Sequence, residues 1–470
     1  MAKKDMKDPT DEKKIKNNWD LLEGKELKAA FDFNDGYLDF LNQAKTEREA
    51  ARYISEVARQ AGFKTLKELK KVAPGSKILI PHKGKVVGMA VLGSQPLDQG
   101  MNIIASHIDA PRLDLKGNPL YEDEELALLK THYYGGIKKY QWVTIPLALH
   151  GVVAKTDGSL VELCIGEDPA DPVFTISDLL PHLAQDQMAK TMNKAIEGED
   201  LNVLIGSHPL ETADNQAVKA RILELLKQRY DIAEEDFSSA EIEIVPAFAA
   251  RHVGLDRSLV GAYGQDDRVS AWASLQAILS VKAPVRTALC LFVDKEEIGS
   301  TGNTGLQSLL LENLTAELLR FSGSKNYYDV RQALVQSYAI SADVNSAVDP
   351  NYVSVFEKRN NSFLNRGVVL TKYTGARGKS GANDANPEFM AALRRLFDQA
   401  RVRWQLGELG KVDIGGGGTV SQYIAYYGME VVDCGVPLMS MHAPFEVSSK
   451  SDIYMSFRAY RAFLQDFMSY

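Results

Sequence analysis

The chain has 470 residues, of which 45% are hydrophobic and 25% are charged, as is typical of a well-packed globular protein. This length exceeds what one ordinary core accommodates, so we expect two domains or one large domain with an insertion. The net charge of -8 argues against a nucleic-acid partner, and the three scattered cysteines exclude a disulfide framework or a cysteine-based zinc site.

The N-terminal 24 residues are charged throughout and lack an apolar core, so they predict a polar arm and not a signal peptide. No later stretch approaches the roughly 18 apolar residues that a membrane span requires. Together with the few cysteines, these features predict a cytoplasmic protein that binds neither membranes nor nucleic acid.

Helical spacing of apolar residues from about 34 to 60 is followed by β-patterns at 77–93 and a buried strand at 101–105. The character of the sequence changes after about residue 117. Strands are predicted at 142–155, 159–165 and 240–250, and helical segments at 176–196 and 211–230. This change predicts a second domain inserted at 118–250.

Strand, loop and helix patterns alternate from residue 251 to the C-terminus. Strands at 287–299, 336–346, 367–375 and 430–444 are interleaved with helices at 304–321, 387–404 and 452–470. Such alternation is typical of an α/β layered domain with a mainly parallel sheet. We therefore expect residues 25–117 and 251–470 to form one α/β domain, interrupted by the insertion.

Histidines and acids cluster where these strands end, and open α/β sheets bind ligands at the carboxyl ends of their strands. The candidates are His107, Asp109, Asp266, Asp267, Glu296, Glu297, Asp343 and His442. Imidazoles and carboxylates suit zinc, and two ions about 3.5–4 Å apart need a bridging carboxylate, for which Asp266 or Asp267 would serve. Each residue alone also has a structural explanation; the aspartate pair, for example, would cap the following helix.

Five stretches, SHIDAPRLDLK, GQDDRVSAWASL, FVDKEEIGSTGNTG, ISADVNSAVDPNY and MSMHAP, resemble the signature blocks of the M18 family of metalloaminopeptidases. They occur in family order, and the resemblance extends from about residue 30 to the C-terminus. It implies an enzyme that removes single residues from the N-termini of peptides. The implied metal ligands are His107, Asp266, Glu297, Asp343 and His442, with Asp266 bridging, Glu296 as general base and Asp109 as the acid behind His107.

The resemblance further implies two divalent ions per chain, zinc with cobalt or manganese as alternatives. The insertion at 118–250 would be a dimerisation domain, because the family has an α/β catalytic domain interrupted by one. Family members commonly build tetrahedral dodecamers, so a homo-oligomer made from dimers is expected. An enclosed oligomer would admit short peptides with a free N-terminus and exclude folded proteins.

Two other functions remain open at this point. A carboxypeptidase or amide deacylase would use a similar dinuclear centre, and a non-enzymatic oligomer would bind peptides without cleaving them. The preferred N-terminal residue is also open, because Thr371 occupies the position of a lysine that the aspartyl branch of the family uses, and Lys372 follows one residue later. We expect a broad or neutral preference.

Overall fold

The computed structural model describes residues 17–324 and 326–470, and the first sixteen residues of the predicted polar arm lie outside this part. Residues 17–23, also assigned to that arm, are packed onto the protein. The Asn18 amide donates a hydrogen bond of 2.7 Å to Asp452, and Leu22 is buried. Asn18 and Leu22 therefore attach this stretch to the protein, although its polar composition predicted an arm in solvent.

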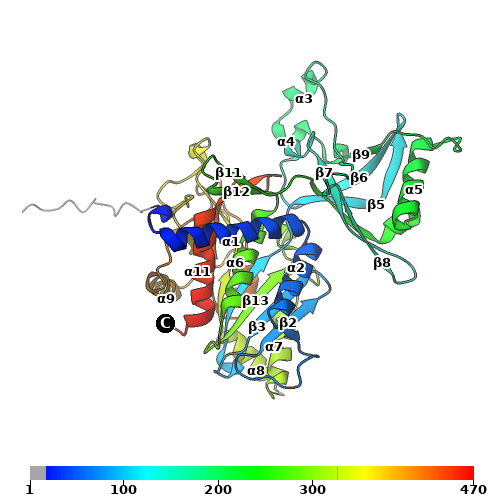
Figure 1. Cartoon of the computed structure of the whole chain (residues 1–470). Coiled ribbons are helices and arrows are strands. Elements are labelled where there is room, and N and C mark those ends of the chain that lie inside the picture. Colours follow the sequence, from blue (N-terminus) through cyan, green and yellow to red (C-terminus); the bar gives the residue numbers. More distant parts are fainter. Residues whose placement is uncertain (1–16, 325) are drawn as a thin grey trace, which may run out of the picture.

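A nine-stranded sheet forms the centre of the larger unit (Figure 1). Its order is β1 (Lys64–Thr65), β2 (Lys77–His82), β3 (Val86–Val91), β13 (Thr287–Val293), β4 (Met101–His107), β14 (Tyr338–Ser341), β18 (Glu430–Gly435), β16 (Val368–Thr371), β17 (Trp404–Leu406). Strands β13, β4, β14 and β18 run parallel, whereas β3 and β16 pair with this core antiparallel. The carboxyl ends of the four central strands consequently meet at one edge.

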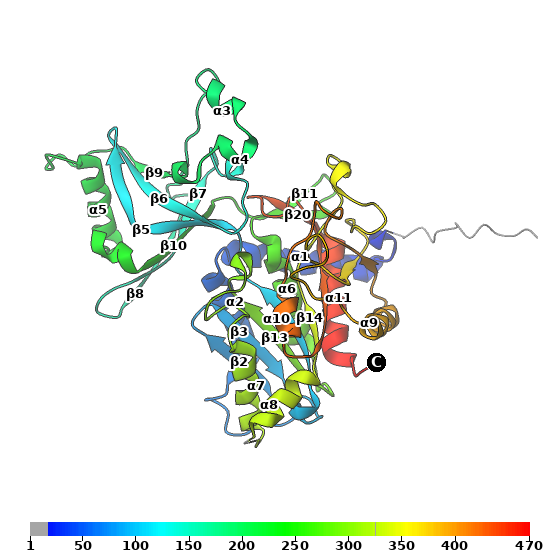
Figure 2. The same cartoon turned by 180° about the vertical axis from the view of Figure 1, so that it is seen from behind.

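Helices cover both faces of this sheet. Cys290 and Ile104 face α1 (Gly24–Gln43), α2 (Glu47–Gln60), α6 (Gln265–Ser280), α9 (Pro387–Gln399) and α11 (Lys450–Asp466). Their neighbours Leu289 and Ile103 face α7 (Leu310–Phe321), α8 (Tyr327–Val335) and α10 (Ser421–Ala425), which lie in front in Figure 2. This alternation along buried strands gives the three-layer α/β architecture predicted from the sequence.

The helical pattern predicted over 34–60 belongs to two helices, α1 and α2. Thr46 ends the connection between them, because its side chain accepts a hydrogen bond from the Glu49 amide while the Glu49 side chain accepts one from the Thr46 amide. This reciprocal capping starts a new helix inside a continuous apolar pattern.

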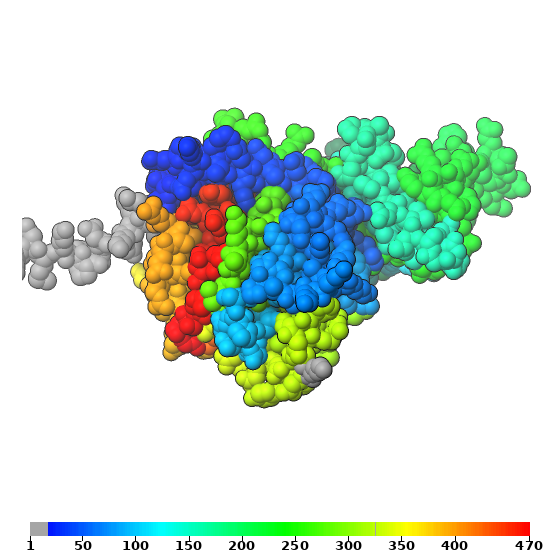
Figure 3. All heavy atoms as spheres, turned by 60° about the horizontal axis from the view of Figure 1, so that its bottom comes forward, coloured from blue at the N-terminus to red at the C-terminus, as the bar shows by residue number. Residues whose placement is uncertain are grey.

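The second large sheet has six antiparallel strands and forms a lobe beside the main body (Figures 1 and 3). Its order is β8 (Leu160–Ile165), β7 (Leu147–Ala154), β10 (Ala240–Pro246), β5 (Arg112–Asp123), β6 (Leu126–Tyr134), β9 (Val203–Gly206), with α5 (Ala217–Tyr230) packed against it. Strand β5 crosses the predicted boundary at residue 118, so the lobe begins earlier.

The long helical segment predicted at 176–196 is mostly irregular. It contains only the short helices α3 (Gln185–Ala189) and α4 (Met192–Ala195). Pro181 interrupts the pattern, and apolar side chains of the segment, such as Leu183 and Met188, are about 70% exposed.

A third sheet of five short strands joins the two units and supports the loop that carries His442. Its order is β11 (Arg251–Val253), β12 (Leu259–Ala262), β20 (Glu446–Ser449), β19 (Pro437–Met439), β15 (Asn345–Ser346). Among the helices of the described residues, none has both the length and the apolar character needed to cross a bilayer.

His150 on β7 connects the lobe to α2 through buried ion pairs. Its Nδ1 lies 2.7 Å from Glu49 Oε1 and its Nε2 lies 3.0 Å from Glu167 Oε1. Burial opposes the charged form, but hydrogen bonds to Cys164, Glu167 and Glu49 outweigh it and raise the pKa of His150 to about 11. The imidazole is therefore protonated at neutral pH in the folded protein.

We expect His150→Gln to lower the free energy of unfolding by about 3 kcal/mol near pH 6, because it breaks a buried ion pair. The unfolded imidazole titrates near pH 6.5. Because the folded pKa is higher, the stabilisation is complete below that pH and declines as pH rises towards 11. Denaturant unfolding of both proteins at pH 6 and pH 9.5 should show a smaller difference at pH 9.5. The exposed His132→Gln is the control; a difference independent of pH would contradict the protonated state.

Candidate metal centre

All seven predicted site residues meet at the carboxyl edge of the nine-stranded sheet. His107 ends β4, Asp109 follows it, Glu296 and Glu297 form a short 3-10 turn after β13, and Asp343 lies two residues beyond β14. Asp266 stands at the start of α6, and His442 follows β19. The residues that follow parallel strands of the nine-stranded sheet lie together because those strands end at the same edge. Asp266 and His442 are instead brought to this edge by strands of the five-stranded sheet.

Asp266 lies between the two histidines. Its Oδ1 is 3.2 Å from His107 Nε2, and its Oδ2 is 3.3 Å from His442 Nε2. His107 Nε2 also lies 3.9 Å from Asp343 Oδ1, and His442 Nε2 lies 3.5 Å from Glu297 Oε2. One carboxylate therefore faces two imidazole–carboxylate pairs, one on each of its oxygens.

Both histidines have their Nδ1 engaged by backbone carbonyls. His107 Nδ1 is 3.1 Å from the Asp109 carbonyl oxygen, and His442 Nδ1 is 2.9 Å from that of Gly136. Because a carbonyl oxygen can only accept, each Nδ1 donates a proton, and a neutral ring then presents its Nε2 lone pair to the carboxylates. Such lone pairs facing anionic oxygens repel unless a proton or a cation lies between them.

Burial and mutual repulsion disturb the titration of the acids. Burial and the charge of Asp266 raise the pKa of Glu297 well above its usual range, and burial raises that of Asp343. Burial also raises the pKa of Glu296 to about 7. Asp266 shows the opposite shift, because its closeness to the imidazoles of His107 and His442 outweighs burial and lowers its pKa.

The donor set fits divalent cations. Asp266 Oδ1 and Glu297 Oε1 are buried and make no hydrogen bond with any residue in the described part of the chain. Buried carboxylate oxygens without a partner are costly, and metal coordination compensates for that cost. Oxygen and imidazole ligands match the preference of zinc. His107, Asp266, Glu297, Asp343 and His442 together offer a donor set that suits such an ion.

Two further acidic groups near the junction of the units are already neutralised by cations. The first group consists of Glu49, His150 and Cys164. Lys45 adds a positive charge beside it, because its Nζ lies 2.6 Å from Glu167. The second group consists of Glu47, Glu241 and Glu243 and is paired with Lys85 and Arg112. These groups are ion-pair networks, in contrast to the strand-end site.

Sequence reasoning missed three parts of the site. Glu446 is buried, and it accepts hydrogen bonds from the amides of His442 (2.7 Å) and Asp266 (3.1 Å). Burial raises its pKa to about 8. An acid just after the MSMHAP stretch, at the start of a strand, was the available signal. The other two parts are Gly136 and Tyr134. Both belong to the insertion, which had not been expected to reach the site.

Glycine is required where the insertion passes the site. Gly135 has φ +71°, and a Cβ there would lie 3.3 Å from Glu297 Oε2. A Cβ on Gly136 would lie 3.3 Å from His442 Nδ1. The YYGG sequence at 133–136 therefore lets the backbone approach both side chains closely.

Comparisons with known proteins agree with this geometry. The profile of the family described as Aminopeptidase I zinc metalloprotease (M18) matches residues 40–464. The chain belongs to the M18 aminopeptidase family. A relative named Probable M18 family aminopeptidase 1, from Clostridium acetobutylicum, is 51% identical over 459 residues, covering 97% of this chain and 99% of the relative.

Solved M18 structures share the fold. The crystal structure of an M18 aminopeptidase from Thermotoga maritima has a TM-score of 0.93 at 43% identity, covering 96% of this chain and 99% of that one. Aminopeptidase I from Clostridium acetobutylicum has a TM-score of 0.89 at 50% identity, with the same coverage. The family predicted from the five sequence stretches and the α/β fold class are thus confirmed, and the protein is a metalloaminopeptidase of an M18 zinc family.

Proposed function

We propose that this M18 protein is a dinuclear aminopeptidase that releases the N-terminal residue of short peptides with two zinc ions per chain. The observation that carries the proposal is the position of Asp266, whose two oxygens face two different histidines. His107 and Asp343 would hold one ion, Glu297 and His442 the other, and Asp266 would bridge them. This arrangement suits the spacing of about 3.5–4 Å typical of two-metal sites.

The bound zinc pair would supply an activated water and polarise the scissile carbonyl. Glu296 would accept the proton of the attacking water and pass it to the leaving amine. The raised pKa of Glu296, about 7, suits a group that must both take and release a proton near neutral pH. Asp109 would hold the His107 ring, and the acids of the centre would face the substrate's α-ammonium group.

The surroundings of Lys372 support a neutral N-terminal preference. Its ammonium group is bonded to Asp384, which also binds Lys379 at 3.0 Å. Thr371, at the end of β16, is buried and accepts a hydrogen bond of 3.1 Å from Asn345. A substrate carboxylate would need an available cation in the pocket, whereas here the ammonium groups of both lysines are bonded to Asp384.

A panel of aminoacyl substrates, assayed in the metal-free and zinc-reloaded protein, tests the proposed activity. We expect leucyl substrates to be cleaved with zinc and their N-acetylated forms to be inert. Cleavage of acetylated peptides from either end would instead indicate a deacylase or carboxypeptidase, and no turnover would indicate a binding protein. Faster cleavage of aspartyl than of leucyl substrates, abolished by Lys372→Ala, would overturn the neutral preference.

We also propose that the insertion, the proposed dimerisation domain, carries contacts between copies of the chain, consistent with the dodecamer that the resemblance implies. Six large apolar side chains between 173 and 192 are at least 50% exposed: Val173, Leu179, Leu180, Leu183, Met188 and Met192. They belong to the outer part of the lobe that carries α3 and α4 (Figure 2). Apolar side chains gathered on one projecting segment are typical of a protein interface.

We expect replacement of Leu179, Leu183 and Met188 by serine to lower the assembly's mass in light scattering, because each loses apolar contact area. The exposed apolar residues Leu309 and Tyr352, in the catalytic unit, serve as matched controls when replaced by serine. An unchanged mass in the triple variant would show that this segment does not hold the assembly together.

A further inference from the structure

Asp109 holds three parts of the metal centre at once. Its Oδ1 accepts the Glu296 amide and its Oδ2 accepts the Glu297 amide, each at 3.2 Å. Its Oδ1 also lies 3.3 Å from His107 Nδ1. The position of this one carboxylate therefore sets the position of an imidazole and of the turn that carries both glutamates.

Tyr134 fixes that carboxylate from the opposite unit. It ends β6 of the six-stranded sheet, and its hydroxyl donates a hydrogen bond of 2.8 Å to Asp109 Oδ2. The side chain is only 8% exposed, so water competes little for this bond. The lobe thus contributes a hydrogen bond directly behind the metal centre.

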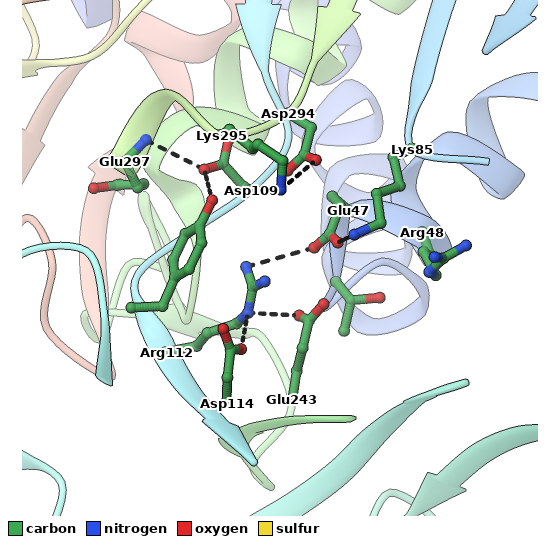
Figure 4. Close-up of polar contacts among 12 residues, drawn as sticks. Glu47, Arg48, Lys85, Asp109, Arg112, Asp114, Glu243, Asp294, Lys295 and Glu297 are labelled. Carbon is green, nitrogen blue, oxygen red and sulfur yellow. Dashed lines mark hydrogen bonds and ion pairs between the residues drawn. The ribbon is translucent and has the colours of Figure 1, made fainter. Parts of the chain in front are cut away.

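Arg112 fixes Tyr134 in turn. The two residues are cross-strand partners on β5 and β6, and the guanidinium carbon lies 4.0 Å from the centroid of the Tyr134 ring. Figure 4 shows Arg112 among Glu47, Asp114 and Glu243, with Asp109 and Glu297 beyond it. Arg112 is ion-paired with all three acids. Its Nε lies 2.8 Å from Asp114 Oδ1 and 3.1 Å from Glu243 Oε2, and its Nη1 lies 3.5 Å from Glu47 Oε2.

These contacts form a continuous path across the junction. Glu47 belongs to α2 of the catalytic unit, Glu243 and Arg112 belong to strands of the lobe, and Asp109 belongs to the metal centre. Arg112 is 5% exposed, and burial of a planar guanidinium between acids and an aromatic face leaves it little freedom. Arg112 therefore packs on the Tyr134 ring, while Asp109 binds its hydroxyl group.

We propose that Tyr134 is a positioning residue of the metal centre: through its hydrogen bond to Asp109 it orients His107 and the Glu296–Glu297 turn. Arg112 supports it by packing on its ring. This inference rests on the proposed dinuclear function. Groups that hydrogen-bond metal ligands directly, as Asp109 does here, typically contribute about 10–100-fold to metal affinity or activity. Tyr134 acts through Asp109, so we expect its contribution at the lower end of this range.

The test compares Tyr134→Phe with Tyr133→Phe. The first removes only the hydroxyl that binds Asp109, whereas Tyr133 is 43% exposed and, as the preceding residue on β6, faces the other side of the sheet. Zinc affinity is measured in both variants by competition with a chelator, and kcat and KM are measured on a leucyl substrate. We expect Tyr134→Phe to weaken zinc binding by about 10-fold and to lower kcat more than it changes KM.

Thermal unfolding of the metal-free proteins separates positioning from stability. A lower melting temperature with unchanged zinc affinity and kcat would mean a merely structural role and would overturn the inference. Arg112→Lys keeps the charge but loses the planar face that packs on Tyr134, so it should also weaken zinc binding, by a smaller factor. Unchanged zinc binding in Arg112→Lys would contradict the inference as well. If the wild-type protein itself bound no zinc, the proposed function would fail instead.

Discussion

Replacing Glu296 by glutamine is expected to lower kcat by about 10²–10⁴-fold, because the amide cannot accept the proton of the attacking water. The bound zinc should remain nearly unchanged, since Glu297 and not Glu296 is the proposed ligand. Steady-state kinetics on a leucyl substrate near neutral pH, with zinc measured in the same samples, provides the result.

Glu297→Gln is the matched comparison, because the two glutamates are neighbours in the same turn. It should lower zinc content at one site, and added zinc should restore part of its activity. Glu296 also has a carboxylate oxygen near His107 and Asp343, in a group whose ligand atoms lie within 4.8 Å of one another. Loss of zinc in Glu296→Gln would therefore assign Glu296 as a ligand, and retained turnover would reject it as the base.

Asp266→Ala is expected to have the largest effect on metal content. Both proposed ions share this carboxylate, so its removal should reduce binding at two sites and abolish activity. Glu297→Ala should mainly affect one site. Zinc per chain, measured after dialysis of both variants against the same buffered zinc concentration, distinguishes the two results.

Asp267→Ala is the control for position, because Asp267 is adjacent and completely buried. If Asp267→Ala lost both ions while Asp266→Ala retained them, the bridging ligand would be Asp267 and not Asp266. Retention of about two ions per chain in Asp266→Ala would reject a bridging carboxylate at this position altogether.

The sequence was most informative where residues follow parallel strands. His107, Glu296 and Asp343 come after buried β-patterns, and the ends of parallel strands must meet at one edge of the sheet. Their convergence is therefore a consequence of secondary structure. Asp266 and His442 were also predicted at strand ends, but the strands before them, β12 and β19, belong to the five-stranded sheet, so parallel strand ends do not explain their position.

The contribution of the lobe could not be predicted from the local sequence. In the sequence, Tyr134 is one aromatic residue in a β-pattern and carries no sign of a role in the site. Its hydroxyl reaches Asp109 only because the two sheets pack together. The same limit applies to Glu446, whose role depends on where β20 lies relative to α6. The helix predicted at 176–196 failed for a different reason, because Pro181 interrupts it and only two short helices form in the segment.

Anomalous scattering at the zinc edge, from crystals of the zinc-loaded protein, tests the dinuclear assignment most directly. We expect two zinc peaks per chain, about 3.5–4 Å apart. One should lie beside His107 and Asp343 and the other beside His442 and Glu297, with an oxygen of Asp266 on each. A single peak at this centre, or zinc bound instead at Glu49, His150 and Cys164, would contradict the proposed function.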